Sequence, residues 1–170
     1  MAVPIAKTIS SQIKSARAIR RRSLATAQRV GQESAAILFA YGTLRRGAPM
    51  HGLLEGRATW LGPASAAGRL VDLGAFPGLV PALSPSDRVR GDLFAIPDGQ
   101  RAELLEALDR YEGASFERVQ QRVAGPDGPA LAWLYVYRGE VAGHRVLAGG
   151  DYLVQEPAFA RLRLAARRPT

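Results

Sequence analysis

The sequence predicts an α+β domain built on a largely antiparallel or mixed sheet. Short apolar runs bounded by glycine and proline recur along residues 35–158, and one clear helical segment lies among them. A turn rich in glycine and proline separates two of the apolar runs. The chain has 170 residues, of which 47% are apolar and 22% are charged, a composition typical of about one globular domain.

The first expected strand is the apolar run at residues 36–41, which Gly42 ends. Val89–Ile96 is a second apolar run, ended by Pro97. The remaining extended segments and the turns are expected over residues 58–73, 76–78 (turn), 116–123, 125–129 (hairpin turn) and 130–137. Together these runs supply several strands for one sheet.

One helix is expected over residues 99–111, with Asp98 as its N-cap and Gly113 as its end. Apolar residues recur there at helical spacing: Leu104, Leu105, Leu108 and Tyr111. The aromatic residues of the strands are expected in the core of the sheet: Trp60, Trp133, Tyr135 and Tyr137. His51 is expected to pack a turn and His144 to lie on the surface.

The net charge of +8 is concentrated at the two ends of the chain. Residues 1–34 hold seven Lys and Arg and one acid, and residues 159–170 hold four Arg and no acid. The domain between them, residues 35–158, holds twelve Arg and fourteen acids. We therefore expect a basic N-terminal extension, a domain and a basic C-terminal tail, and no nucleic-acid binding by the domain itself.

Three interpretations fit the basic segment 1–34. It is a transit peptide, an arm that contacts RNA, a membrane or an acidic partner, or a flexible extension. No continuous apolar stretch follows its basic residues, which argues against a secretory signal. We expect a cytoplasmic protein, or a mitochondrial one if residues 1–34 are a transit peptide.

The composition excludes several kinds of chemistry. The absence of cysteine rules out disulfides, thiolate zinc sites and cysteine nucleophiles, and two histidines are too few for a histidine-rich metal centre. No apolar run approaches the roughly 18 residues of a membrane span. Motifs of nucleotide-binding loops, serine hydrolases and zinc proteases are also missing. We expect no metal, no cofactor and no membrane span.

Two features remain as candidate functional residues. The loop Tyr41, Gly42, Thr43 and Leu44 directly follows the first strand, and successive N–H groups in such a turn converge on an anion or a carbonyl oxygen. The alternative for this loop is a plain turn.

The second feature is Glu112, which continues the apolar stripe of the helix four residues after Leu108. Desolvation there raises the pKa of a carboxyl group toward the range of a general base. The alternatives are a frayed helix end that leaves Glu112 in water, or pairing with Arg118 or Arg122. Asp109, by contrast, is expected to be solvated.

Both features belong to a series of motifs in a fixed order. These are Tyr-Gly-Thr-Leu-Arg-Arg-Gly at 41–47, Phe-Pro-Gly-Leu-Val-Pro at 76–81, Val-Arg-Gly-Asp-Leu-Phe at 89–94, Leu-Asp-Arg-Tyr-Glu-Gly at 108–113, Ala-Trp-Leu-Tyr-Val-Tyr at 132–137 and Gly-Asp-Tyr at 150–152. The series resembles the γ-glutamylcyclotransferase-like family, which includes the AIG2-like and BtrG-like proteins.

The resemblance implies a small mixed β-barrel flanked by helices, with a pocket at one end. In the family, the glutamate of the Leu-Asp-x-x-Glu-Gly segment is the catalytic base, and this falls on Glu112. The backbone of the Tyr-Gly-Thr-Leu loop holds the substrate, and this falls on Tyr41 to Leu44. Many relatives have tyrosine two residues before Arg118, where this chain has Phe116.

The implied reaction closes a ring within the substrate. The α-amine of a γ-glutamyl amine or amide attacks its own γ-carbonyl and releases 5-oxoproline and a free amine, without metal or cofactor. The substrate stays open among a γ-glutamylamine, a γ-glutamyl-ε-lysine fragment, a γ-glutamyl dipeptide and a γ-glutamylated carrier. The alternative function is a non-catalytic module that binds a small metabolite or a partner on the same fold.

Overall fold

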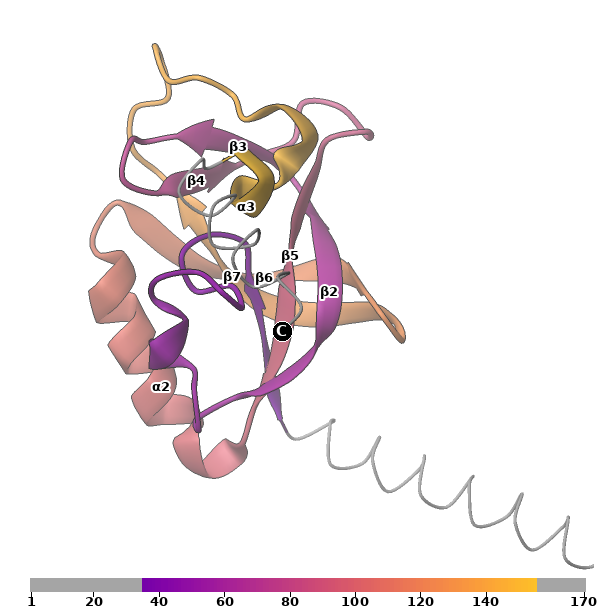
Figure 1. Ribbon diagram of the computed structural model, residues 1–170, viewed down its shortest axis with the longest axis vertical. Helices are drawn as coiled ribbons and strands as arrows, with labels where there is room; N and C mark the ends of the chain where they lie inside the picture. Colours follow the sequence, from indigo (N-terminus) through magenta and orange to yellow (C-terminus); the bar gives the residue numbers. More distant parts are fainter. Residues whose placement is uncertain (1–34, 156–170) are drawn as a thin grey trace, which may run out of the picture. The chain divides into compact units, whose positions relative to one another are not determined.

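The computed structural model describes residues 35–155, so the expectations for residues 1–34 and 159–170 lie outside the described residues. Within residues 35–155, five strands form a closed barrel in the order β1-β5-β2-β6-β7, and β3 and β4 form a separate two-stranded sheet (Figure 1). The strands are β1 (Ala36–Ala40), β2 (Thr59–Ala67), β3 (Arg69–Asp72), β4 (Pro77–Val80), β5 (Arg88–Ile96), β6 (Phe116–Gly125) and β7 (Gly128–Tyr137). The helices are η1 (His51–Leu53), α2 (Asp98–Glu112), η2 (Ala148–Gly150) and α3 (Tyr152–Gln155).

The barrel closes through β1, which pairs antiparallel with β5 and parallel with β7. The parallel contact joins Leu38 to Trp133. Strands β6 and β7 form a long hairpin around a two-residue turn, Pro126-Asp127, as the glycine- and proline-rich segment predicted. The mixed sheet therefore confirms the α+β class and the small mixed barrel that the resemblance implied.

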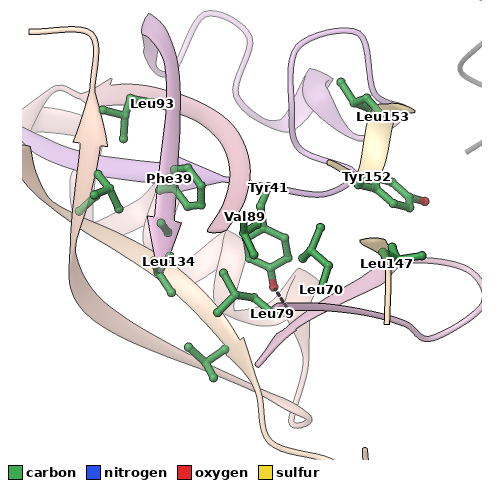
Figure 2. Packing of buried hydrophobic residues seen from close by; sticks show 14 of the residues in the cluster. Phe39, Tyr41, Leu70, Leu79, Val89, Leu93, Leu134, Leu147, Tyr152 and Leu153 are labelled. Atoms are coloured by element: carbon green, nitrogen blue, oxygen red, sulfur yellow. Dashed lines mark hydrogen bonds between the residues drawn. The ribbon is translucent and has the colours of Figure 1, made fainter. Parts of the chain in front are cut away.

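Strand β1 is buried on both faces, which explains why it reads as a continuous apolar run. Phe39 belongs to the core inside the barrel, together with Leu134 of β7. Leu38 belongs to a second core between the barrel and α2, together with Leu104 and Leu108 of that helix. Figure 2 shows the first of these cores, with Tyr41 reaching toward Leu79 of β4.

Helix α2 matches the expected helix to within one residue at each end. Its start differs in detail, because Asp98 is the first helical residue and makes no capping hydrogen bond. Asp98 forms instead a 3.1 Å ion pair with Arg101, one turn along the helix. Gly113 ends the helix at a φ of 75°, a conformation that favours glycine, and its N–H donates to the carbonyl oxygen of Asp109.

Two expectations about local structure were wrong. The chain bends at residues 74–76, whereas Pro77 and Gly78 begin strand β4. Proline is tolerated there because the first residue of an edge strand need not donate to the ladder. Trp60 is not a core residue: it is 41% exposed, and the guanidinium of Arg46 lies 4.4 Å from its ring centroid.

The two histidines lie where they were expected. His51 begins η1, with Nδ1 3.2 Å from the carbonyl oxygen of Leu44 and its ring against Phe94. His144 lies on the surface, with Nδ1 3.0 Å from the carbonyl oxygen of Asp72.

Candidate active site

A cavity of about 150 Å³ lies where β1 ends and α2 ends. All the candidate residues line it: the loop Tyr41 to Leu44 and the carboxyl-bearing Glu112. The other lining residues are Leu38, Phe39, Ala40, Phe76, Pro77, Tyr111, Phe116 and Tyr135. The folding of the chain therefore brings together two features that are about 70 residues apart in the sequence.

The cavity has a buried floor and a more exposed rim. The floor is formed by β1 and the loop that follows it, whose lining residues Leu38 and Tyr41 are buried. Two lining residues reach the surface: Phe76 is 43% exposed and Tyr111 is 36% exposed. This volume is below the usual range of about 300–1,000 Å³ for small-molecule sites, so the cavity as it stands is too small for a large cofactor.

The loop after β1 lines the cavity and contains three successive backbone N–H groups without a partner in the described protein. Its carbonyl groups are used, because the Gly42 oxygen accepts from the N–H of Arg45 and the Thr43 oxygen from that of Met50. Within residues 35–155, however, the N–H groups of Gly42, Thr43 and Leu44 donate no hydrogen bond to another group of the protein. Amides arranged in this way are suited to hold a negatively charged oxygen.

Gly42 packs closely against another lining residue of the cavity. A Cβ atom at this position would lie 3.0 Å from Cγ of Pro77, which is tighter than most real Cβ contacts. A larger residue would therefore need a small displacement of Pro77 or of the loop. Glycine at this position allows the loop to lie close to β4.

The side chain of Tyr41 serves the fold. Its hydroxyl donates a 2.8 Å hydrogen bond to the carbonyl oxygen of Tyr135 and accepts one from the N–H of Leu79. Burial raises the pKa of the Tyr41 hydroxyl far above its usual value, with the nearby carboxylate of Glu112 acting in the same direction. Tyr41 therefore ties β1 to β7 and β4, and its hydroxyl stays protonated.

A buried ion network, which the sequence analysis did not identify, supports the same loop. Nε of Arg45 lies 3.1 Å from Oδ2 of Asp92, and its Nη1 lies 2.7 Å from Oδ1 of Asp151. The N–H of Arg46 also donates to Asp92. The available signal was that all three ionic residues stand inside the quoted motifs, far apart in the sequence.

Glu112 is the last residue of α2 and is half-buried. No hydrogen bond or ion pair joins its carboxyl group to any residue that the structure describes. Burial raises the pKa of Glu112 to about 7. The expected alternative, pairing with Arg118 or Arg122, does not occur: Arg118 pairs with Asp109 at 3.2 Å and lies over the ring of Trp133.

Three residues around Glu112 have contacts that the sequence did not predict. Asp109 is exposed, as expected, but it also accepts a 2.8 Å hydrogen bond from the hydroxyl of Tyr135 and pairs with Arg118. Tyr135 is buried in the core, as expected, and it also lines the cavity. Tyr111, expected on the apolar stripe, lies at the rim with its hydroxyl 2.8 Å from Oγ1 of Thr43.

The described part of the chain contains no cluster of three histidine, aspartate or glutamate side chains that could hold a metal ion. Over the same residues, no helix has both the length and the apolar character to cross a membrane.

The fold and the cavity define a small barrel protein whose cavity is lined by a partly buried carboxyl group and by a loop with free backbone amides. The model of one protein family, described as "Gamma-glutamyl cyclotransferase, AIG2-like", matches residues 38–154. The chain belongs to this family, as the series of sequence motifs predicted.

Individual relatives agree with this assignment. The chain is 32% identical to the "Gamma-glutamylcyclotransferase family protein YtfP" of Escherichia coli K12 over 123 residues, 68% of this chain and 95% of the relative. It is 33% identical to the "Gamma-L-glutamyl-butirosin B gamma-glutamyl cyclotransferase" of Niallia circulans over 106 residues, 59% of this chain and 65% of that protein.

The fold is also found among solved structures. An AIG2-like protein from Mus musculus superimposes with a TM-score of 0.59 at 23% identity, over 73% of this chain and 92% of that one. An uncharacterized protein from Pyrococcus horikoshii gives a TM-score of 0.54 at 23% identity, over 77% and 95% of the two chains. Membership of the family supports an activity of the γ-glutamylcyclotransferase type.

Proposed function

We propose that this protein releases 5-oxoproline and a free amine from a γ-glutamyl amine or amide, with Glu112 as the general acid and base. The observation that carries this proposal is the unpaired carboxyl group of Glu112, whose pKa burial raises to about 7, in one cavity with three free N–H groups. The Niallia circulans relative, which is named as a γ-glutamyl cyclotransferase of a γ-glutamyl compound, supports the same chemistry.

The first step is the loss of a proton. The α-ammonium of the substrate has a pKa of about 8, so most of it is protonated and cannot attack at neutral pH. Ionised Glu112 takes one proton from this group, and a carboxylate with a pKa near 7 is a far better base than one near 4.5. Burial of Glu112 thus reduces the difference between the pKa of the base and the pKa of the substrate's α-ammonium group.

Ring closure and release follow within the same cavity. The freed α-nitrogen forms a bond to the γ-carbon, and the carbonyl electrons move onto oxygen to give a tetrahedral intermediate whose ring nitrogen carries two protons and a positive charge. The carbonyl then re-forms, the bond from the γ-carbon to the leaving nitrogen breaks, and the proton held by Glu112 passes to that nitrogen. The ring nitrogen gives its extra proton to the Glu112 carboxylate, which returns it to water or to the released amine, so that 5-oxoproline leaves with one ring N–H. The nucleophile and the electrophile belong to one molecule, so the protein mainly has to hold the substrate in the bent conformation that brings them together. Such intramolecular positioning lowers the activation barrier by up to about 7–11 kcal/mol in the best cases.

The loop amides complete the proposed mechanism. We assign the N–H groups of Gly42, Thr43 and Leu44 to the negative oxygens of the substrate, which are the α-carboxylate and the oxygen of the tetrahedral intermediate. Tyr41 contributes to this site through its backbone, since its hydroxyl is already bonded to β7 and β4.

The experiment that tests the proposal measures 5-oxoproline released from a panel of γ-glutamyl amides by the wild-type protein and Glu112→Gln. We expect Glu112→Gln to fold and to lose at least 100-fold in kcat/KM, in the range that general acid–base catalysis supplies. Glu106→Gln is the matched control, because Glu106 lies on the same helix and pairs with Arg110 at the surface.

Wild-type rates in Glu112→Gln would remove Glu112 from the mechanism. No 5-oxoproline from any amide, with wild-type protein shown to be folded, would contradict the cyclotransferase proposal and favour a binding module.

A further inference from the structure

Three aromatic rings from separate segments meet beside the mouth of the cavity. The ring of Phe76, in the bend before β4, lies edge-on to Phe116 at the start of β6, with ring centroids 6.0 Å apart and an interplanar angle of 60°. Phe116 in turn contacts Tyr137 at the end of β7, at 5.4 Å. We call these three residues the aromatic rim. Phe76 and Phe116 line the cavity directly.

Phe76 and Phe116, the two residues of the aromatic rim that line the cavity, have no polar side-chain atom to offer a ligand. Glu112 is the one charged side chain among the lining residues. The four hydroxyl groups that line the cavity are already bonded within the protein: Tyr41 to Tyr135, Thr43 to Tyr111, and Tyr135 to Asp109. A ligand group that passes the rim therefore meets ring carbons and no cation from the residues that line the cavity.

Phe76 places apolar surface at the mouth of the cavity. The residue is 43% exposed, so part of its ring lies in water unless a ligand covers it. Its neighbour Phe116 also lines the cavity and is also a phenylalanine, so neither ring carries a hydroxyl group. Both features make the mouth more apolar than the reaction itself requires, because ring closure uses only the glutamyl part of the substrate.

We infer that the aromatic rim is the subsite for the substituent of the leaving amine, and that it selects uncharged alkyl or aryl amines against amines that carry a carboxylate at the same distance. The inference rests on the proposed cyclotransferase function. With the glutamyl group on the cavity floor beside Glu112 and the loop amides, the leaving nitrogen faces outward and its substituent leaves between the rings.

The physical basis is a difference in desolvation. An alkyl chain loses water favourably against Phe76 and Phe116. A carboxylate in the same place loses its hydration against the electron-rich ring faces, with no opposite charge among the lining residues to replace the water. The rim therefore discriminates between substrates that share the glutamyl group and differ only in the substituent of the leaving amine.

The test compares kcat/KM for 5-oxoproline release from γ-L-glutamyl n-butylamide, γ-L-glutamyl-β-alanine and γ-L-glutamyl methylamide. The first two carry substituents of similar size, one apolar and one anionic, and the third carries a substituent too short to reach far along the rim. We expect the wild-type protein to prefer the butylamide over the β-alanine amide by tenfold or more.

Two variants assign the preference to the rim. Phe76→Ala should lower the ratio of butylamide to methylamide kcat/KM about tenfold, since the exposed ring is lost. Phe116→Tyr keeps the ring and adds a hydroxyl, so it should fold normally and lower the ratio of butylamide to β-alanine amide. The control is Leu83→Ala, which removes an exposed apolar side chain that does not line the cavity and should leave both ratios unchanged.

The outcomes separate the two proposals. Turnover of all three amides at similar kcat/KM, or an equal loss on all three in Phe76→Ala, would overturn the inference and leave the cyclotransferase function standing. Absence of 5-oxoproline from every amide would overturn both.

Discussion

Glu112 destabilises the fold when it is ionised, because it is partly buried, and the same burial suits it to act as the base of the proposed reaction. Leu108, one turn earlier on α2, is fully buried, and this spacing turns Glu112 inward instead of toward water. Since no described residue pairs with the carboxyl group, its charged form is disfavoured by desolvation alone. A group of this kind is expected to be visible in pH dependence, both of activity and of stability.

The activity of the wild-type protein should depend on the ionisation of Glu112. We expect log kcat/KM to rise with unit slope below pH 7 and to level off near the pKa of about 7, because the base must be ionised in the free enzyme. A pH profile of kcat/KM for 5-oxoproline release measures this rise and the apparent pKa at which it ends. An apparent pKa near 4.5, the ordinary value of a glutamate, would show that the titrating group is not a buried Glu112.

The same titration should appear in the free energy of unfolding. The pKa of Glu112 is raised in the folded state, so between pH 4.5 and about 7 the unfolded chain releases a proton that the folded chain keeps. Stability from this group is therefore present at low pH and is lost as pH rises through that interval. Relative to the wild-type protein, Glu112→Gln should gain up to about 3 kcal/mol between pH 4 and pH 8. Urea denaturation at both pH values measures the gain, and a difference independent of pH would contradict it.

At the scale of elements, the loop after β1 is held by charges from distant parts of the chain. Arg45 stands between Asp92 of β5 and Asp151, which precedes α3, and all three side chains are largely withdrawn from water. Asp92 also accepts from the N–H of Arg46, the next residue of the same loop. The position of the three free amides therefore depends on a network outside the cavity.

Removal of the central cation should disturb both the fold and the loop. Arg45→Met keeps much of the side-chain length but leaves Asp92 and Asp151 without their cation, so we expect a loss of about 3–5 kcal/mol in the free energy of unfolding. Arg45→Lys keeps the charge and should lose less, although it cannot contact both carboxylates with a planar fork. Chemical denaturation compares the two, and equal stability of Arg45→Met and wild type would show that the network is not stabilising.

The elements that the sequence predicted well are those with a clear repeating pattern or a strong end signal. Strand β1 was visible as an apolar run before Gly42, and α2 was visible from Leu104, Leu108 and the terminal Gly113. Glu112 and the loop after β1 were identified because the same patterns placed them at the ends of these elements. Local sequence contains that information.

Other features depend on which distant residues become neighbours, and local patterns do not contain this. Asp109 is on the outer face of α2 by helical spacing, yet Tyr135 and Arg118 reach it from the barrel. Trp60 has a large apolar side chain that is typical of a core residue, but it lies under Arg46 at the surface. Phe76 and Pro77 look like a turn, although tertiary pairing with Asp72 draws Pro77 into a strand.

At the scale of the whole described domain, β1 separates two hydrophobic cores, and the cavity lies at the end of that strand. One core joins the barrel strands to the β3-β4 sheet and to residues 147–153, and the other joins α2 to the barrel. The floor of the cavity takes Phe39 from the first core and Leu38 from the second. Stability and activity should therefore respond differently to damage in the two cores.

Leu108→Ala and Leu134→Ala test this difference with one chemical change. Both side chains are fully buried and neither lines the cavity, so each variant should lose about 2–5 kcal/mol of stability. Leu108 anchors the last turn of α2 that carries Glu112, whereas Leu134 packs inside the barrel. Small displacements of a catalytic group are costly, so Leu108→Ala should lower kcat for 5-oxoproline release about tenfold or more, and Leu134→Ala less than threefold. Thermal denaturation sets a temperature at which both variants are folded. Equal losses of kcat there would mean that the helix end is not positioned by the second core.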